Sequence, residues 1–180
     1  MRIPSQLSLL CLLLFFATPA TAQDAAIQLQ SLIDERQLIH AADGIDDAID
    51  HKDWKLARSF FADDVEIDFS SLEGEKGKVK ADDLISGWQA NLFSPKKSLH
   101  LRTNHLVTIL GDRAMMTSHG YAWNQLTGLD PDLWEVWGFY THEFARTTDG
   151  WKVTRMVFEK TYERGNPEVR TALAAPEQKL

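Results

Sequence analysis

The sequence predicts an α+β fold in which N-terminal helices cover the concave side of one curved sheet. Two observations predict this class. Apolar residues recur at three- and four-residue steps early in the chain, and with a period of two after Pro95. A run of helices followed by a run of long strands is typical of α+β proteins and not of alternating βαβ units. The 180 residues fit a single domain.

The first 22 residues form a predicted signal peptide. Arg2 supplies a positive charge, residues 7–16 are an apolar run too short to span a bilayer, and residues 20–22 (Ala-Thr-Ala) form a cleavage site. Cys11 lies inside the apolar run and follows a leucine, which argues against a lipoprotein. We expect cleavage after Ala22 and a secreted or periplasmic protein.

Removal of this leader changes what the chain can bind. The only cysteine is lost, which excludes disulfides, iron–sulfur ligation and a cysteine nucleophile. The net charge of −7 becomes −8 because Arg2 is lost as well. An acidic chain without a Lys/Arg-rich stretch is not expected to bind nucleic acid or, after cleavage, a membrane.

Three helices are expected before the long strands. Residues 27–51 show the amphipathic period, with a bend near Gly44. Asp53 can cap a short helix over residues 54–61, and Asp82 and Asp83 can open a third that ends before Pro95.

Alternating residues predict one short and four long strands. The short strand covers residues 65–69, and residues 70–80 are expected to form a loop. The long strands are expected at 98–110, 113–126, 133–147 and 151–163. Strands of this length twist, so the sheet curls. The domain is predicted over residues 23–164, followed by a peripheral tail, 165–180.

Several polar side chains share strand faces, because side chains alternate with period two. His100, Arg102 and Asn104 share one face. His119, Tyr121 and Trp123 share another, and a third includes Tyr140 and His142. A carboxylate beside an imidazole is the minimal apparatus for proton abstraction. Asp50 ends the first helix, but spacing alone does not pair it with His100, and a helix-end role stays open for it.

Three stretches resemble SnoaL-like proteins of the nuclear-transport-factor-2-like superfamily. They are residues 48–66 (AIDHKDWKLARSFFADDVE), the strand motif from His100 to Asn104, and residues 138–153 (GFYTHEFARTTDGWKV). The resemblance spans roughly residues 28–163. It implies a cone-shaped α+β barrel, with N-terminal helices packed into a strongly curved mixed or antiparallel sheet around a hydrophobic pocket.

The resemblance also implies site residues. Scytalone dehydratase, lindane dehydrochlorinase and bile-acid 7α-dehydratase use an Asp–His dyad, which falls here on Asp50 and His100. A second catalytic histidine would correspond to His119. Ile45 stands where the bile-acid enzyme has a catalytic tyrosine, so a tyrosine would have to reach the pocket from the sheet. The expected substrate-binding residues are Asn104, Tyr121, Trp123, Tyr140 and His142.

Two functions remain open at this stage. The first is a cofactor-independent lyase of the dehydratase type, or an isomerase, acting on a small hydrophobic cyclic substrate. The second is a binding protein that holds a hydrophobic small molecule without transforming it. No cofactor is expected, and no metal, because the histidines lack close ligand spacing. We expect a homodimer or homotrimer.

Overall fold

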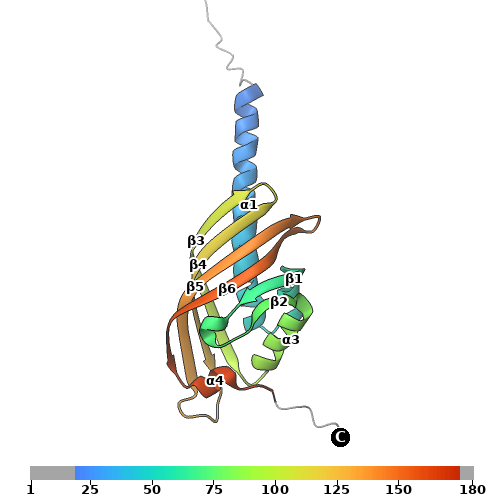
Figure 1. The fold of residues 1–180 in the computed structure, drawn as a ribbon. Helices are drawn as coiled ribbons and strands as arrows, with labels where there is room; N and C mark the ends of the chain where they lie inside the picture. Colours follow the sequence, from blue (N-terminus) through green and yellow to red (C-terminus); the bar gives the residue numbers. More distant parts are fainter. Residues whose placement is uncertain (1–18, 175–180) are drawn as a thin grey trace, which may run out of the picture.

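A computed structural model describes residues 19–174 of the chain, and the order of elements is helices, then strands, then a short helix (Figure 1). The predicted leader lies mostly outside the described residues, so its cleavage and the protein's location stay predictions. The elements are α1 (Pro19–Asp50), α2 (Trp54–Ser59), β1 (Phe61–Asp68), η1 (Ser70–Leu72), β2 (Lys76–Lys80), α3 (Ala81–Asn91), β3 (Lys97–Leu110), β4 (Arg113–Gln125), β5 (Leu133–Thr147), β6 (Gly150–Gly165) and α4 (Pro167–Thr171).

The six strands form one open mixed sheet in the order β2-β1-β6-β5-β4-β3. All neighbours are antiparallel except β1 and β6, which run parallel. The long strands curve around the C-terminal half of α1, which confirms the predicted α+β cone (Figure 1). The sheet is not closed into a barrel, because β2 and β3 remain edge strands.

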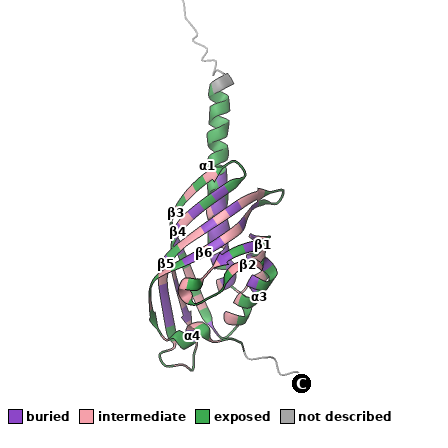
Figure 2. Cartoon of the chain, viewed as in Figure 1, coloured by how far each residue is buried: buried purple, intermediate pink, exposed green. Residues whose placement is uncertain are grey.

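Helix α1 has two different halves. Its side chains from residue 21 to Ile33 are exposed, and from Asp34 onward one face is buried against the sheet (Figure 2). Leu38, Ala42 and Ile45 are fully buried at three- and four-residue spacing, so the amphipathic pattern is confirmed where the sheet covers it. The buried stripe holds the end of α1, at Asp50, against β3.

Two local predictions were wrong. Residues 70–80 are not all loop, because β2 pairs antiparallel with β1 as an edge strand. The segment after Gly165 is not merely peripheral, because α4 buries Val169 completely in a cluster with Trp134, Val136 and Phe158. The Asn166 side-chain oxygen accepts the Glu168 backbone N–H and so caps this short helix. Within the described residues, no helix is long and apolar enough to cross a membrane.

Candidate active site

Asp50 and His100 lie in direct contact where α1 ends against β3. Asp50 Oδ1 is 2.7 Å from His100 Nδ1, and Asp50 Oδ2 accepts the His100 backbone N–H at 2.6 Å. Both side chains are largely buried, with 10% of Asp50 and 14% of His100 exposed. The two bonds to one residue fix the carboxylate relative to the ring. They leave Nε2 of the imidazole as the nitrogen that can accept a proton.

A hydroxyl and an amine extend this pair. Ser98, two residues before His100 on β3, donates to Asp50 Oδ1 at 2.7 Å, and Lys52 Nζ donates to Ser98 Oγ at 3.2 Å. Burial by itself would raise the pKa of Asp50, but the bonds from His100 and Ser98 and the charge of His100 outweigh it, and the pKa is lowered. Asp50 is therefore held as the anion that can stabilise an imidazolium.

One helical turn earlier, Asp46 makes a second ion pair. It binds Arg102 in bidentate fashion, at 2.9 Å to Nε and 2.6 Å to Nη2. Arg102 Nη1 lies 3.0 Å from Nε2 of the fully buried His142, and its guanidinium stacks on Tyr140 at 3.9 Å from the ring centre. Burial and the charge of Arg102 hold the pKa of His142 well below its ordinary value. His142 is therefore neutral and accepts a hydrogen bond from Arg102.

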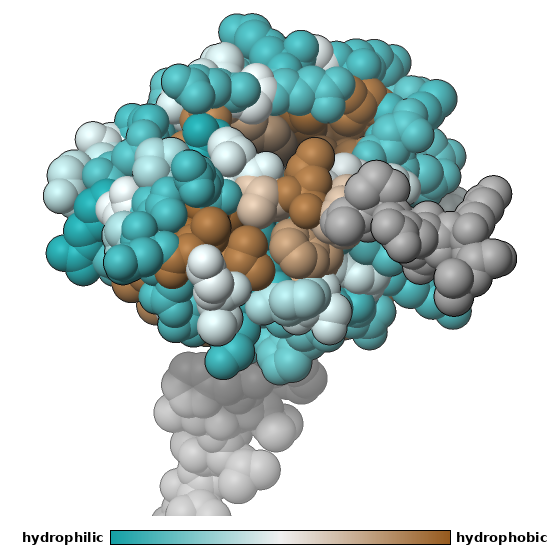
Figure 3. Space-filling view, turned by 90° about the horizontal axis from the view of Figure 1, so that it is seen from below, coloured by the Kyte–Doolittle hydropathy of each residue, from teal (hydrophilic) through white to brown (hydrophobic). Residues whose placement is uncertain are grey.

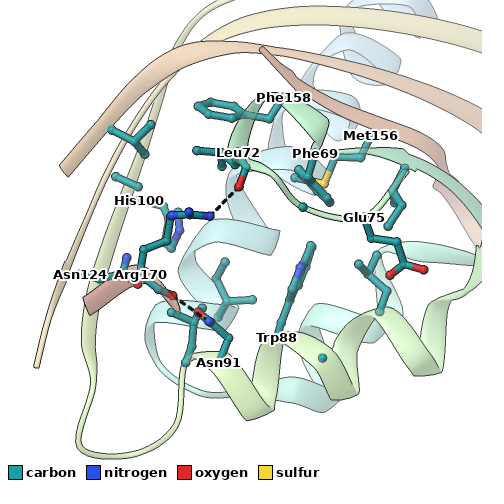
Figure 4. A pocket seen from close by; sticks show the side chains of 18 of the residues that line it. Phe69, Leu72, Glu75, Trp88, Asn91, His100, Asn124, Met156, Phe158 and Arg170 are labelled. Atoms are coloured by element: carbon teal, nitrogen blue, oxygen red, sulfur yellow. Dashed lines mark hydrogen bonds between the residues drawn. The ribbon is translucent and has the colours of Figure 1, made fainter. Parts of the chain in front are cut away.

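A cavity of about 430 Å³ opens beside these pairs, between the sheet, α3 and α4. Its walls are mainly apolar, from side chains such as Ile67, Phe69, Trp88, Met156 and Phe158. Its polar lining includes Asp46, His100, Asn124, Tyr140 and Arg170. Seen from the end that carries α3 and α4, apolar side chains show between polar ones (Figure 3). The close-up shows His100, Asn124 and Arg170 gathered on one side and Glu75 on the other (Figure 4).

Two glycines make room for the aromatic wall. A Cβ on Gly120 would lie 2.4 Å from the Tyr140 ring, and one on Gly138 would lie 2.5 Å from the Phe158 ring. Tyr140 can therefore lean across β4 and reach both Arg102 and the cavity. Burial raises the pKa of Tyr140 above its ordinary value, so its hydroxyl stays protonated.

Of the eight predicted site residues, the structure brings Asp50, His100, Tyr140 and His142 to the inner side of the sheet. Only His100 and Tyr140 of these four line the cavity itself. Asp50 lies behind His100, and His142 supports Arg102. Tyr140 is thus a tyrosine that reaches the cavity from the sheet.

The structure places the other four predicted residues away from the cavity. His119, Tyr121 and Trp123 lie on the outer face of β4, since the inner face carries the even-numbered residues that include Gly120, Ala122 and Asn124. The exposed His119 packs on Phe139, and Tyr121 donates to Glu135 at 2.7 Å.

Asn104 is likewise displaced. A β-bulge between Thr103 and Leu106 interrupts the alternation of β3 at this residue. Asn104 is exposed there, with a φ of 56°. It therefore does not continue the inner face on which His100 and Arg102 lie.

Sequence reasoning did not identify Asp46, Asn124 or Arg170, nor Ser98 and Lys52 beside the dyad. Asp46 was available as the residue one turn before Asp50 on α1, which places it on the same helix face. Asn124 was available as the last polar residue on the inner face of β4. Arg170 carried no signal, because nothing in a polar tail indicates that it folds back. Within the described residues, no cluster of three or more His, Cys, Asp or Glu could hold a metal ion.

Comparison with known proteins places this geometry in a family. The model of the SnoaL-like domain matches residues 30–157. The chain belongs to the SnoaL-like family. No curated protein sequence matches the chain significantly.

Solved structures share the fold of this SnoaL-like protein. The Kfla4162 protein from Kribbella flavida is 30% identical with a TM-score of 0.74, over 79% of this chain and 99% of its own. A scytalone dehydratase-like protein from Novosphingobium aromaticivorans is 15% identical with a TM-score of 0.68, over 83% and 97%. A hexachlorocyclohexane dehydrochlorinase is 19% identical with a TM-score of 0.62, over 83% and 98%. The last two show likeness of fold.

Proposed function

We propose that this SnoaL-like protein is a cofactor-independent lyase of the dehydratase type, or an isomerase, that acts on a small cyclic substrate. The observation that carries the proposal is the 2.7 Å contact between Asp50 and His100 at the edge of a cavity with mainly apolar walls. The names of the fold relatives, a scytalone dehydratase-like protein and a dehydrochlorinase, are consistent with elimination chemistry.

The base in this reaction is His100. Asp50 accepts the Nδ1–H of the ring, so the neutral tautomer carries its lone pair on Nε2. Nε2 removes a proton from a substrate carbon, and the electron pair of that C–H bond forms the new double bond. The anionic Asp50 stabilises the imidazolium that results, and the apolar walls strengthen this interaction by excluding water.

The departing group needs a proton if it leaves as water. Tyr140 lines the cavity and keeps its phenolic proton because burial raises its pKa. It donates a hydrogen bond to the leaving oxygen, and the proton that His100 took from carbon passes to that oxygen, so that water departs and His100 is neutral again. In an isomerase the leaving step is absent and His100 returns its proton to another carbon.

Deuterium exchange tests the base without knowledge of the natural substrate. 2-Tetralone is a small bicyclic ketone with acidic protons next to its carbonyl, and their exchange in D₂O is followed by NMR. We expect the protein to accelerate exchange and His100→Ala to reduce the acceleration by roughly a hundredfold or more, the usual worth of a general base. His119→Ala is the matched control, because His119 lies on the outer face.

A His100→Ala variant that keeps its rate within about tenfold would show that His100 is not the base. If the wild-type protein binds 2-tetralone but exchanges no protons, the alternative function gains support. The protein would then be a binding protein for hydrophobic small molecules. Export, a secreted or periplasmic location, and assembly into a homodimer or homotrimer also remain proposals. A molecular mass in solution that corresponds to a single chain would refute the assembly.

A further inference from the structure

We infer that Asn124 and Arg170 form a carboxylate-binding subsite in the cavity, so that the preferred ligand is a small cyclic carboxylic acid. This inference deepens the proposed function, on which it rests for the shared cavity, by naming the substrate class. The acid group is an anchor, held beside His100 by residues that take no part in proton transfer.

Asn124 is a polar side chain without a partner. The residue is only 5% exposed, and its amide makes no hydrogen bond in the part of the chain that the structure describes. In that part of the chain, the side-chain polar atoms that are both unpaired and fully buried from solvent are Ser118 Oγ and Arg170 Nε. The unpaired Asn124 amide is not one of them, so it is accessible from the cavity that it lines. A buried amide is normally hydrogen-bonded, because an unpaired one loses its bonds to water and gains none in the protein. A ligand that accepts a hydrogen bond supplies the missing partner.

The sheet register places this amide next to the base. Asn124 is the cross-strand partner of Ser98, and His100 is the partner of Ala122. His100 and Asn124 are therefore diagonal neighbours on one face, roughly 7 Å apart, which is within the span of a small ring. One ligand can touch both side chains.

Arg170 brings the positive charge to the same side of the cavity. Asn124 is also the partner of Trp134 on β5, and the Arg170 guanidinium lies 6.0 Å from the Trp134 ring. Arg170 donates to the Leu72 carbonyl through Nη1, and among the described residues its ion pair is with the exposed Glu73, at 3.3 Å from Nη2. Its charge also helps to lower the pKa of Glu163, but that carboxylate is paired with Lys160. Arg170 Nε has no acceptor. An arginine with spare donors and a weak, exposed counter-ion is suited to bind a carboxylate of the ligand.

The segment that carries Arg170 is fixed in place. Its backbone carbonyl accepts from Asn91 at 2.8 Å, and the next turn accepts from Lys96 Nζ at the Ala172 carbonyl, 2.7 Å away. The guanidinium thus projects from a held backbone into the cavity, as the close-up shows (Figure 4).

The remaining charges direct an anion to this side. Asp46 is neutralised by its bidentate contact with Arg102. Glu75 lies across the cavity from Arg170 (Figure 4), and Asp83 is an exposed residue of α3. A carboxylate is therefore attracted to Arg170 and repelled from the opposite rim, which gives a ring one orientation relative to His100.

The test compares two probes with one ring, 2-naphthoate and 2-naphthalenemethanol. Binding is measured by calorimetry and by fluorescence of Trp88 and Trp134, which line the cavity. We expect the wild-type protein to bind the acid at least roughly tenfold more tightly than the alcohol, because a hydrogen bond to a charged group is worth that much. Asn124→Leu and Arg170→Met should each remove most of this preference and change the dissociation constant of the alcohol by less than about threefold.

Two further variants test the role of charge and provide a control. Asn124→Asp preserves shape but adds a negative charge, so it should weaken the acid more than Asn124→Leu does. Arg155→Met removes an arginine that pairs with Glu66 and Glu143 outside the cavity, so it should change neither probe. Unfolding curves of each variant check that it is still folded under the conditions of the binding measurements.

Equal binding of acid and alcohol by the wild-type protein would overturn the inference, as would variants that weaken both probes alike. A wild-type protein that does not bind the acid below about 1 mM would overturn it as well. His100→Ala should keep the acid preference, so loss of the proposed reaction and loss of the proposed subsite are separate results.

Discussion

Two carboxylates on successive turns of α1 bind two basic side chains on one strand, yet the pairs do different things. Asp46 and Asp50 are four residues apart and share a helix face, and Arg102 and His100 are two residues apart and share a strand face. The scaffold of both pairs is thus the same. The difference lies in the base that β3 supplies.

Arg102 makes its pair permanent. Burial would lower the pKa of this guanidinium, but Asp46 outweighs it and the pKa is raised, so Arg102 keeps its charge. Its side chain is 1% exposed, and Tyr140 and His142 cover it. His100, in contrast, supplies an imidazole whose Nε2 stays available as a base while Nδ1 is held by Asp50. One pair therefore holds α1 to the sheet, and its neighbour can do proton chemistry.

The largest expected effect comes from breaking the permanent pair. Arg102→Met leaves Asp46 buried without its partner, so we expect the free energy of unfolding to fall by about 3–5 kcal/mol. Urea unfolding measures it. Arg155→Met is the control, because its ion pairs are partly exposed and should be worth less than about 1 kcal/mol. Equal costs for the two variants would mean that Arg102 is not structural.

The second pair should cost less and should depend on pH. Asp50→Asn places a donor against the Ser98 hydroxyl or the His100 backbone, with an expected cost of about 1–3 kcal/mol at pH 7. The pKa of Asp50 is lowered in the folded protein. Its contribution is complete above the ordinary pKa and is lost as the pH falls through the lowered one. The gap between wild type and variant should therefore shrink in acid.

Asp34 provides a reference for this acid effect. Hydrogen bonds from Arg146 and Trp151 lower the pKa of Asp34 to about 2 despite burial. The same unfolding curves for Asp34→Asn should show a gap that is complete above the ordinary pKa of 3.8 and shrinks until the pH reaches about 2. A gap for Asp50→Asn that does not change with pH would show that Asp50 is not stabilised as an anion.

The sequence predicted the elements whose pattern is set by one buried face. The four long strands and the buried half of α1 follow from periods of two and 3.6. Strand β2 was missed because KGKVK has charged, exposed side chains at an open edge, a pattern that indicates a loop as readily as an edge strand. The parallel pairing of β1 with β6 joins strands that are far apart in the sequence, so no local sequence pattern predicts it.

The site was half predictable for a similar reason. Alternation groups His119, Tyr121 and Trp123 on one face of β4, but it does not say which face points inward. The inner face is the one with Gly120 and Ala122, since rings from β5 and β6 need its space. The aromatic residues of β4 therefore did not mark the face that points toward the cavity. Asn124 and Arg170 depend on register and on the return of the tail, which only the three-dimensional structure supplies.

The smallest expected effect concerns Ser98, whose hydroxyl binds Asp50. In the described contacts, Asp46 has no such hydroxyl partner. Ser98→Ala removes one of three donors to the Asp50 carboxylate, at a cost of about 1 kcal/mol. The carboxylate becomes more basic, so the acid limb of the exchange rate should move to higher pH while the rate falls only a few-fold. Ser98→Thr keeps the hydroxyl and should restore the wild-type limb. A lower rate with an unmoved limb would mean that Ser98 only packs against the dyad, whereas a shifted limb would show that it sets the charge on which the chemistry of His100 depends.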